Sequence, residues 1–194
     1  MALILASASA IRRLMLHSAG VEHEAIPSNV DEDAIKARHE RPEQLALDLA
    51  EAKAQAVSRQ HLDAWTIGSD SIAAIQGIGM FDKPASREQA AEHLRRFSGR
   101  RMRLTSAVAL ARDGRVEWRH AEDAYLYIRP LSEKFIEHYL AAEWPEVGHC
   151  VGVFRLEDRG VQLFDRIDGD YFTILGMPLI PLLGALRERG LIAA

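Results

Sequence analysis

The chain of 194 residues is long enough to form one domain with a substantial core, and its 48% hydrophobic and 27% charged residues are typical of a soluble globular protein. A formal net charge of −4 argues against a general nucleic-acid binder. The single cysteine, Cys150, excludes an intramolecular disulfide and favours a reducing cytoplasm. No segment has the length and apolarity that spanning a membrane requires, since the most apolar one, residues 171–186, contains two glycines and two prolines.

The first twenty residues predict a strand, a hydroxyl-rich loop and a helix. Residues 3–5 are apolar and suit a buried strand rather than a signal peptide, because the arginines follow the apolar run instead of preceding it. Ser7 and Ser9 lie in the loop, and Ser9 is expected to cap a helix that stops at Gly20. Backbone N–H groups, two hydroxyls and the positive end of the helix dipole then converge, which predicts an anion site.

Arg12 and Arg13 follow in the first turn of this helix, where positive charge opposes the dipole. Their placement has two interpretations. Either the pair offsets the charge of an anionic partner, or both side chains lie on a solvated face.

Two further features precede the centre of the chain. Residues 22–26 suit a second strand, and the acidic run after it either caps a short helix or, through Glu32, helps to hold a divalent cation. Residues 42–60 predict a long helix that begins at Pro42 and carries an apolar stripe. Lys53 lies beside that stripe, and a lysine on a helix usually faces solvent.

Residues 65–84 are the stretch around which we expect the protein to be organised. Residues 65–67 form a short apolar strand, and Asp70 stands alone between two apolar runs, at the predicted end of that strand. A lone carboxylate there, with Lys83 about a dozen residues later, suits the handling of a metal-bound phosphate. The alternative is that Asp70 is a turn-forming residue or a helix cap.

The rest of the chain mixes helices with strands. The predicted helices span residues 87–97, 133–142 and 178–189, and the predicted strands span residues 101–112, 116–128, 151–154 and 160–167, the first two joined by the hairpin turn Asp113-Gly114. This order predicts a mixed-sheet α/β domain with two lobes.

Five segments together resemble the Maf family of nucleotide pyrophosphatases, also called septum formation inhibitors. They are Leu5-Ala6-Ser7-Ala8-Ser9 with Arg12-Arg13; Gly68-Ser69-Asp70-Ser71 with Asp82-Lys83-Pro84; Phe97-Ser98-Gly99-Arg100; Arg129-Pro130-Leu131-Ser132; and Ile167-Asp168-Gly169-Asp170-Tyr171-Phe172 with Gly176-Met177-Pro178-Leu179. The resemblance covers essentially the whole chain, so one domain over residues 1–194 is expected.

The resemblance implies an activity and a set of site residues. The activity is hydrolysis of a nucleoside triphosphate to the monophosphate and pyrophosphate with a divalent cation, Mg or Mn. The fold implied is an elongated mixed β-sheet flanked by helices, in two lobes with a central cleft, and members are often homodimers. Asp70 matches the family's catalytic base, with Glu32 beside it at the metal. The phosphate-site matches are Ser7, Ser9, Arg12, Arg13, Lys53 and Lys83.

Three positions concern the choice of base. Glu157 is similar to the acid of the 7-methyl-GTP branch, whereas Ile11 and Ser71 match neither that branch nor the dTTP/UTP branch. A glutamate accepts hydrogen bonds from guanine N1–H and the N2 amine. Its alternative is a solvated charge beside Asp158 and Arg159.

The function expected from these features is a house-cleaning pyrophosphatase for non-standard or surplus nucleotides. An alternative from another class is a nucleotide-binding regulator of cell division that does not turn its nucleotide over. A third is a phosphatase that releases orthophosphate.

Overall fold

The computed structural model describes residues 2–193, and the chain divides into two compact units. The first unit takes the residues up to Ser71, then Thr105–Glu122, and the residues from Asp170 onward. The second unit takes Ile72–Leu104 and Asp123–Gly169. Three strands contribute residues to both units, namely β3 (Ala64–Ile75), β5 (Arg101–Arg112) and β6 (Arg115–Ile128).

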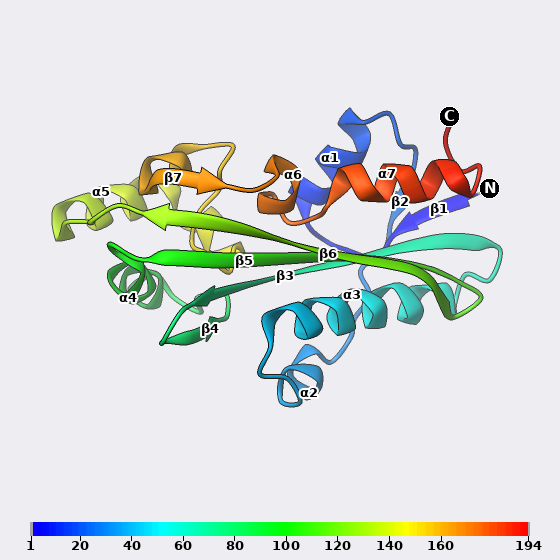
Figure 1. The fold of residues 1–194 in the computed structure, drawn as a ribbon, viewed down its shortest axis with the longest axis horizontal. Coiled ribbons are helices and arrows are strands. Elements are labelled where there is room, and N and C mark those ends of the chain that lie inside the picture. The colour runs from blue at the N-terminus through cyan, green and yellow to red at the C-terminus, as the bar shows by residue number, and fades with distance from the viewer. Residues whose placement is uncertain (1, 194) are drawn as a thin grey trace. The chain divides into compact units, whose positions relative to one another are not determined.

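The other elements complete a mixed sheet and its flanking helices (Figure 1). They are β1 (Ala2–Leu5), α1 (Ala10–Ser18), β2 (Glu24–Ala25), α2 (Glu32–Lys36), α3 (Pro42–Ser58), β4 (Gly79–Phe81), α4 (Arg87–Phe97), α5 (Glu133–Glu143), η1 (Glu146–His149), η2 (Arg159–Leu163), β7 (Phe164–Asp168), α6 (Tyr171–Ile174) and α7 (Leu179–Glu188). The strand order is β2-β1-β3-β5-β6-β7, with β4 paired to β3. β1 runs parallel to β2 and β3, whereas β4 and β7 run antiparallel to their partners, so the predicted mixed α/β class is confirmed.

Alternate residues of β3 face opposite sides of the sheet within the first unit. Ile67 belongs to an apolar cluster with Met15 of α1 and residues of α7, whereas Ala64 packs with Val57 of α3. Figure 1 shows α1 and α7 on one side of these strands and α3 on the other. Odd-numbered residues of β3 therefore face α1 and α7, and even-numbered residues face α3.

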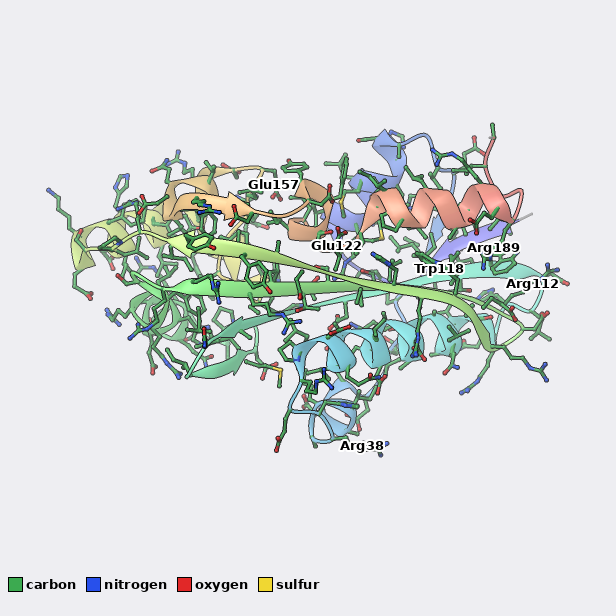
Figure 2. All side chains as sticks on the ribbon, viewed as in Figure 1. Arg38, Arg112, Trp118, Glu122, Glu157 and Arg189 are labelled. Carbon is green, nitrogen blue, oxygen red and sulfur yellow. The ribbon has the colours of Figure 1, made fainter. Side chains whose placement is uncertain are left out.

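Trp65 shows how the last helix is held against the sheet. Its ring lies under two guanidinium groups, those of Arg112 at 5.7 Å and Arg189 at 5.5 Å from the ring centroid. The two arginines come from the end of β5 and the end of α7 (Figure 2). Cation–π contacts and apolar burial thus act together on this helix.

Among residues 2–193, no helix has both the length and the apolar character that crossing a bilayer requires.

The local signals in the sequence located most elements. Ser9, Ser86 and Ser132 each accept a backbone N–H as the N-cap of a helix. The predicted hairpin turn at Asp113-Gly114 is present, and both residues have positive φ, at 52° and 73°. These are the values that a two-residue hairpin of the favoured twist demands.

Four sequence predictions about strands were wrong. The strand predicted over residues 22–26 is only Glu24–Ala25, and residues 151–154 form a turn in which Val153 has φ of 54°. The first part of the strand predicted over residues 160–167 is the 3-10 helix η2. The strand that begins at residue 64 does not end before Asp70 but continues to Ile75. Apolar β-branched runs are short here, so periodicity alone could not separate strand from tight turn.

His93 on α4 predicts a pH dependence of stability. Its side chain is buried between Phe81 and Phe97, its Nδ1 lacks a hydrogen-bond partner among the described residues, and burial lowers its pKa. Arg96 lowers that pKa further, while Glu92 and Asp82 oppose the shift. The folded protein thus binds fewer protons than the unfolded chain below the ordinary histidine pKa of about 6.5, and stability falls as pH drops through that window.

We expect the free energy of unfolding, measured in urea, to fall between pH 7.5 and pH 5.5, and to fall less in His93→Leu. His138→Leu serves as the matched control, because His138 is an exposed histidine of the neighbouring helix α5. An equal pH slope in the wild type and in His93→Leu would contradict the prediction.

Candidate active site

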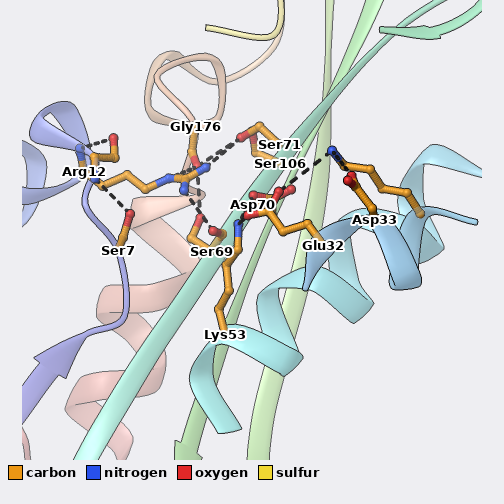
Figure 3. Close-up of polar contacts among 12 residues, drawn as sticks. Ser7, Arg12, Glu32, Asp33, Lys53, Ser69, Asp70, Ser71, Ser106 and Gly176 are labelled. Carbon is orange, nitrogen blue, oxygen red and sulfur yellow. Dashed lines mark hydrogen bonds and ion pairs between the residues drawn. The ribbon is translucent and has the colours of Figure 1, made fainter. Parts of the chain in front are cut away.

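Lys53 lies at the centre of a cluster of charges in the first unit (Figure 3). Its Nζ lies 2.6 Å from Oδ1 of Asp70 and 2.7 Å from Oε1 of Glu32. Its side chain is only 11% exposed, so this lysine does not face solvent as lysines on helices usually do. A buried ammonium needs partners of opposite charge, and the carboxylates of Asp70 and Glu32 are such partners.

The close approach of α3 to β3 brings Lys53 to Asp70. Gly68, two residues before Asp70 on the same face of the strand, lies under α3. A Cβ at this position would lie 2.1 Å from the carbonyl oxygen of Ala50 and 2.5 Å from the backbone nitrogen of Ala54. The helix backbone can approach this closely only because residue 68 has no side chain.

Glu32 reaches the cluster from the first turn of α2. Asp31 caps that helix by accepting from the N–H of Ala34, so part of the acidic run acts as a helix cap. Glu32 also lies 4.0 Å from Lys36 one turn later. Of the two alternatives for the acidic run, capping is present at Asp31, and Glu32 joins the charged cluster through Lys53.

Arg12 takes a position different from that expected of a solvated arginine. It donates from Nε to the carbonyl of Gly176 at 2.9 Å, from Nη1 to the carbonyl of Ser69 at 2.9 Å, and from Nη2 to the hydroxyl of Ser71 at 3.2 Å. Ser71 faces away from α3, so this guanidinium lies on the opposite side of β3 from the carboxylate of Asp70. The guanidinium of Arg12 and the carboxylate of Asp70, both predicted site groups, thus lie at opposite faces of β3.

The loop after β1 carries its two serine hydroxyls at the start of α1. The hydroxyl of Ser7 accepts from the N–H of Ser9 at 3.1 Å, and the hydroxyl of Ser9 accepts from the N–H of Arg12 at 3.5 Å. Because both hydroxyls act as acceptors here, their hydrogens remain to donate to an anion. Ile11 is half-buried in the first turn and Arg13 is exposed.

Lys83 and Glu157 belong to the second unit, and both are exposed. Both lie near Cys150. Burial raises the pKa of that thiol to about 11, the negative charge of Glu157 adds to the shift, and Lys83 opposes it. Glu157 stands in a turn that Arg155 holds by a 2.9 Å contact with the buried carboxylate of Glu143.

Sequence reasoning missed three buried residues that lie next to Arg12 and Ser71. Ser69, Ser106 and Gly176 all bond to Arg12 or to Ser71 and are buried, yet none carries a charge that would single it out. Gly68 did offer a signal, because a glycine inside a strand often marks the close approach of another backbone.

Carboxylates around the lysine define the chemistry that this site suits. Among the described residues, groups of three or more His, Cys, Asp or Glu side chains at metal-binding distance do not occur. Glu32 and Asp70, however, bond the same ammonium nitrogen, and Mg²⁺ is commonly held by one or two carboxylates together with substrate phosphates. Two acids, a buried lysine and a hydroxyl-lined helix start suit a hydrolase of phosphate anhydrides.

Comparison with known proteins identifies the family. The family model described as Maf-like protein matches residues 2–189, and the chain belongs to this family.

Named relatives match over nearly their whole length. A 7-methyl-GTP pyrophosphatase of Rhizobium meliloti (strain 1021) is 47% identical, over 99% of this chain and 98% of its own. A nucleoside triphosphate pyrophosphatase of Sphingopyxis alaskensis is 46% identical, over 98% of both chains. A solved nucleoside-triphosphatase / dITP/XTP pyrophosphatase from Mycobacterium abscessus aligns with 98% of this chain and 96% of its own, at 16% identity and a TM-score of 0.46.

Proposed function

We propose that this protein hydrolyses nucleoside triphosphates to the monophosphate and pyrophosphate. The observation that carries the proposal is the cluster of Asp70, Lys53 and Glu32 in a chain of the Maf-like family. The names of the full-length relatives support the same enzyme class. An acid held by a lysine beside a second acid is suited to activating water next to a phosphate chain.

In the proposed reaction, Asp70 is the general base. Its carboxylate accepts a proton from a water molecule as the water oxygen forms a bond to the α-phosphorus. The bond between that phosphorus and the oxygen bridging to the β-phosphate breaks, and pyrophosphate leaves with the electron pair. Lys53 holds the carboxylate through the 2.6 Å contact to Oδ1, which leaves Oδ2 to receive the proton.

Charge on the triphosphate is offset by groups of the chain. We propose that the hydroxyls of Ser7 and Ser9 and the start of α1 bind phosphate oxygens, and that Arg13 and Lys83 contribute positive charge. A divalent cation, Mg or Mn, would be held by Glu32 and Asp70 and would neutralise charge as pyrophosphate departs. The two carboxylates fit such an ion in number and type, with substrate oxygens completing its ligands.

Base selection is the finer part of the proposal. Four of the relatives are named 7-methyl-GTP pyrophosphatases and others carry the broader name nucleoside triphosphate pyrophosphatase. We propose that Glu157 favours a guanine-type base, since a carboxylate accepts from N1–H and the N2 amine. We also propose that the enzyme is cytoplasmic and acts as a homodimer. The single cysteine supports a reducing compartment.

A nucleotide panel tests the proposal. The protein is incubated with Mg²⁺ or Mn²⁺ and each of GTP, 7-methyl-GTP, UTP and dTTP, and pyrophosphate, orthophosphate and monophosphate are measured separately. We expect pyrophosphate and monophosphate in equal amounts. Orthophosphate as the first product would instead identify a phosphatase, and no turnover of any nucleotide would overturn the proposal.

Glu157→Gln addresses the base. A glutamine amide donates to O4 of uracil or thymine and loses an acceptor for guanine, so we expect the ratio of kcat/KM for 7-methyl-GTP over UTP to fall about tenfold. Asp158→Asn is the matched control, because it alters the next carboxylate of the same exposed turn. An unchanged ratio in Glu157→Gln would refute the role of Glu157 and leave the enzyme class intact.

A further inference from the structure

Arg12 holds both neighbours of Asp70 in the sequence. Nη1 donates to the backbone carbonyl of Ser69 at 2.9 Å, and Nη2 donates to the side-chain hydroxyl of Ser71 at 3.2 Å. The planar guanidinium presents its N–H groups in a fixed geometry, so these contacts define the position of the strand segment as well as its distance from α1.

The side chains of Arg12, Ser69 and Ser71 meet at the backbone carbonyl of Gly176. The oxygen of Gly176 accepts from Arg12 Nε at 2.9 Å and from Ser69 Oγ at 3.0 Å, and it lies 3.2 Å from Ser71 Oγ. Gly176 has φ of 108°, and a Cβ there would lie 3.3 Å from Ser71 Oγ. A side chain at residue 176 would therefore both strain the backbone and press on the hydroxyl.

The network continues into the interior of the first unit. Ser71 and Ser106 share a 2.8 Å hydrogen bond, and Ser106 Oγ donates to the carbonyl of Thr173 at 2.7 Å. Thr173 Oγ1 donates in turn to Glu122 at 2.8 Å, the carboxylate labelled in Figure 2. Ser106 and Thr173 are fully buried, and buried polar networks in which each member is bonded hold a single arrangement firmly.

The orientation of this network relative to Asp70 decides what it can do. Ser69 and Ser71 point away from α3, and Asp70 between them points toward Lys53, because side chains alternate along a strand. Figure 3 shows the arginine and the lysine on opposite sides of this segment. The hydrogen bonds of Arg12 thus hold β3 from the face opposite the carboxylate of Asp70.

We infer that Arg12 and Ser71 are positioning residues for Asp70, not ligands of the phosphates or of the base. This inference rests on the proposed hydrolysis, with Asp70 as its base. It differs from the roles that the family resemblance implied for both residues. Their hydrogen bonds hold Asp70 where its carboxylate contacts Lys53, which also contacts Glu32, so Arg12 and Ser71 act on the rate of the chemical step.

The kinetic consequences differ from those of a binding residue. Displacing a catalytic group by about 1 Å costs on the order of 10²-fold in rate. We therefore expect Arg12→Lys and Ser71→Ala to lower kcat by about 10- to 100-fold, with KM changed by less than about threefold. The ratio of kcat/KM for 7-methyl-GTP over UTP is expected to stay as in the wild type. Ser71→Thr keeps the hydroxyl and is expected to restore most of the rate.

Steady-state kinetics on both nucleotides, with a melting curve for each variant, provide the test. Arg119→Lys is the matched control, an exposed arginine of the first unit that pairs with Glu51, and its kinetics should equal those of the wild type. A raised KM with unchanged kcat in Arg12→Lys would show a phosphate ligand and overturn the inference. A changed nucleotide ratio in Ser71→Ala would show a base-reading residue and overturn it as well.

The two proposals fail in different ways. A wild-type protein that releases no pyrophosphate from any nucleotide defeats the proposed function, and the inference falls with it. An active wild type whose Arg12 variant loses only substrate affinity defeats the inference alone. If Arg12→Lys does not fold, the pair of Ser71→Ala and Ser71→Thr decides the question. Ser71→Ala removes the hydroxyl that accepts from Arg12, and Ser71→Thr keeps it, so the two variants test the same hydrogen bond.

Discussion

Asp70→Asn should lower the rate of pyrophosphate release by about 10²- to 10⁴-fold, the range typical for loss of a general base. An amide has nearly the shape of the carboxylate but does not accept the proton of the attacking water. The amide oxygen still accepts from Lys53, so the fold and the nucleotide affinity should persist. Turnover is measured by pyrophosphate release under saturating nucleotide, and affinity by titration calorimetry.

The control for this variant is Asp48→Asn on α3. Asp48 also accepts from a side chain, that of Gln44, and pairs with His39, but it does not contact Lys53. Its turnover should match the wild type. Wild-type turnover in Asp70→Asn would remove Asp70 as the base, whereas binding without turnover in the wild type itself would favour a nucleotide-binding regulator.

Gly68→Ala should produce the largest loss of stability. The added methyl would lie 2.1 Å from a backbone oxygen of α3, and a helix backbone cannot rotate aside as a flexible side chain can. Overpacking usually costs 1–3 kcal/mol, so with backbone on both sides of the contact we expect a loss of about 3 kcal/mol or more in the free energy of unfolding. Moving α3 outward also draws Lys53 from Asp70, so activity should fall even where the protein remains folded.

Gly184→Ala provides the same chemical change with the opposite expected sign. A Cβ at Gly184, inside α7, would meet nothing within 4 Å, and alanine is a better helix former than glycine. We expect a gain of about 0.5–1 kcal/mol in urea unfolding. Equal effects in the two variants would mean that α3 does not need the glycine at position 68.

Much of the fold was accessible from local rules. Ser9, Ser86 and Ser132 mark helix starts because a hydroxyl before an apolar periodic segment satisfies free N–H groups, which is a short-range effect. The pair Asp113-Gly114 marks a hairpin because both residues tolerate the positive φ of a tight turn, which is also a local property. By contrast, the turn at Val153 places a β-branched residue at positive φ, which no local preference predicts and only the surrounding structure can enforce.

The site was accessible only in outline. Asp70 could be named as a candidate because it stands alone between apolar runs, and Glu32 because it belongs to an acidic run. The family resemblance added Lys53. The burial of Lys53 depends on where α3 crosses β3, and this is a long-range property of packing. The same limit applies to Arg12, whose acceptors lie 57 to 164 residues away in the sequence.

The uninterrupted course of β3 has a consequence for how such a protein can diverge. Asp70, the proposed general base, lies in the middle of a twelve-residue strand. A change that moves this residue would therefore also disturb the sheet, and chemistry and folding would be selected together. Glu157 stands in an exposed turn, where side chains can be exchanged at little cost in stability. Relatives that share close to half of their residues can therefore keep one reaction while drifting in the nucleotide that they accept.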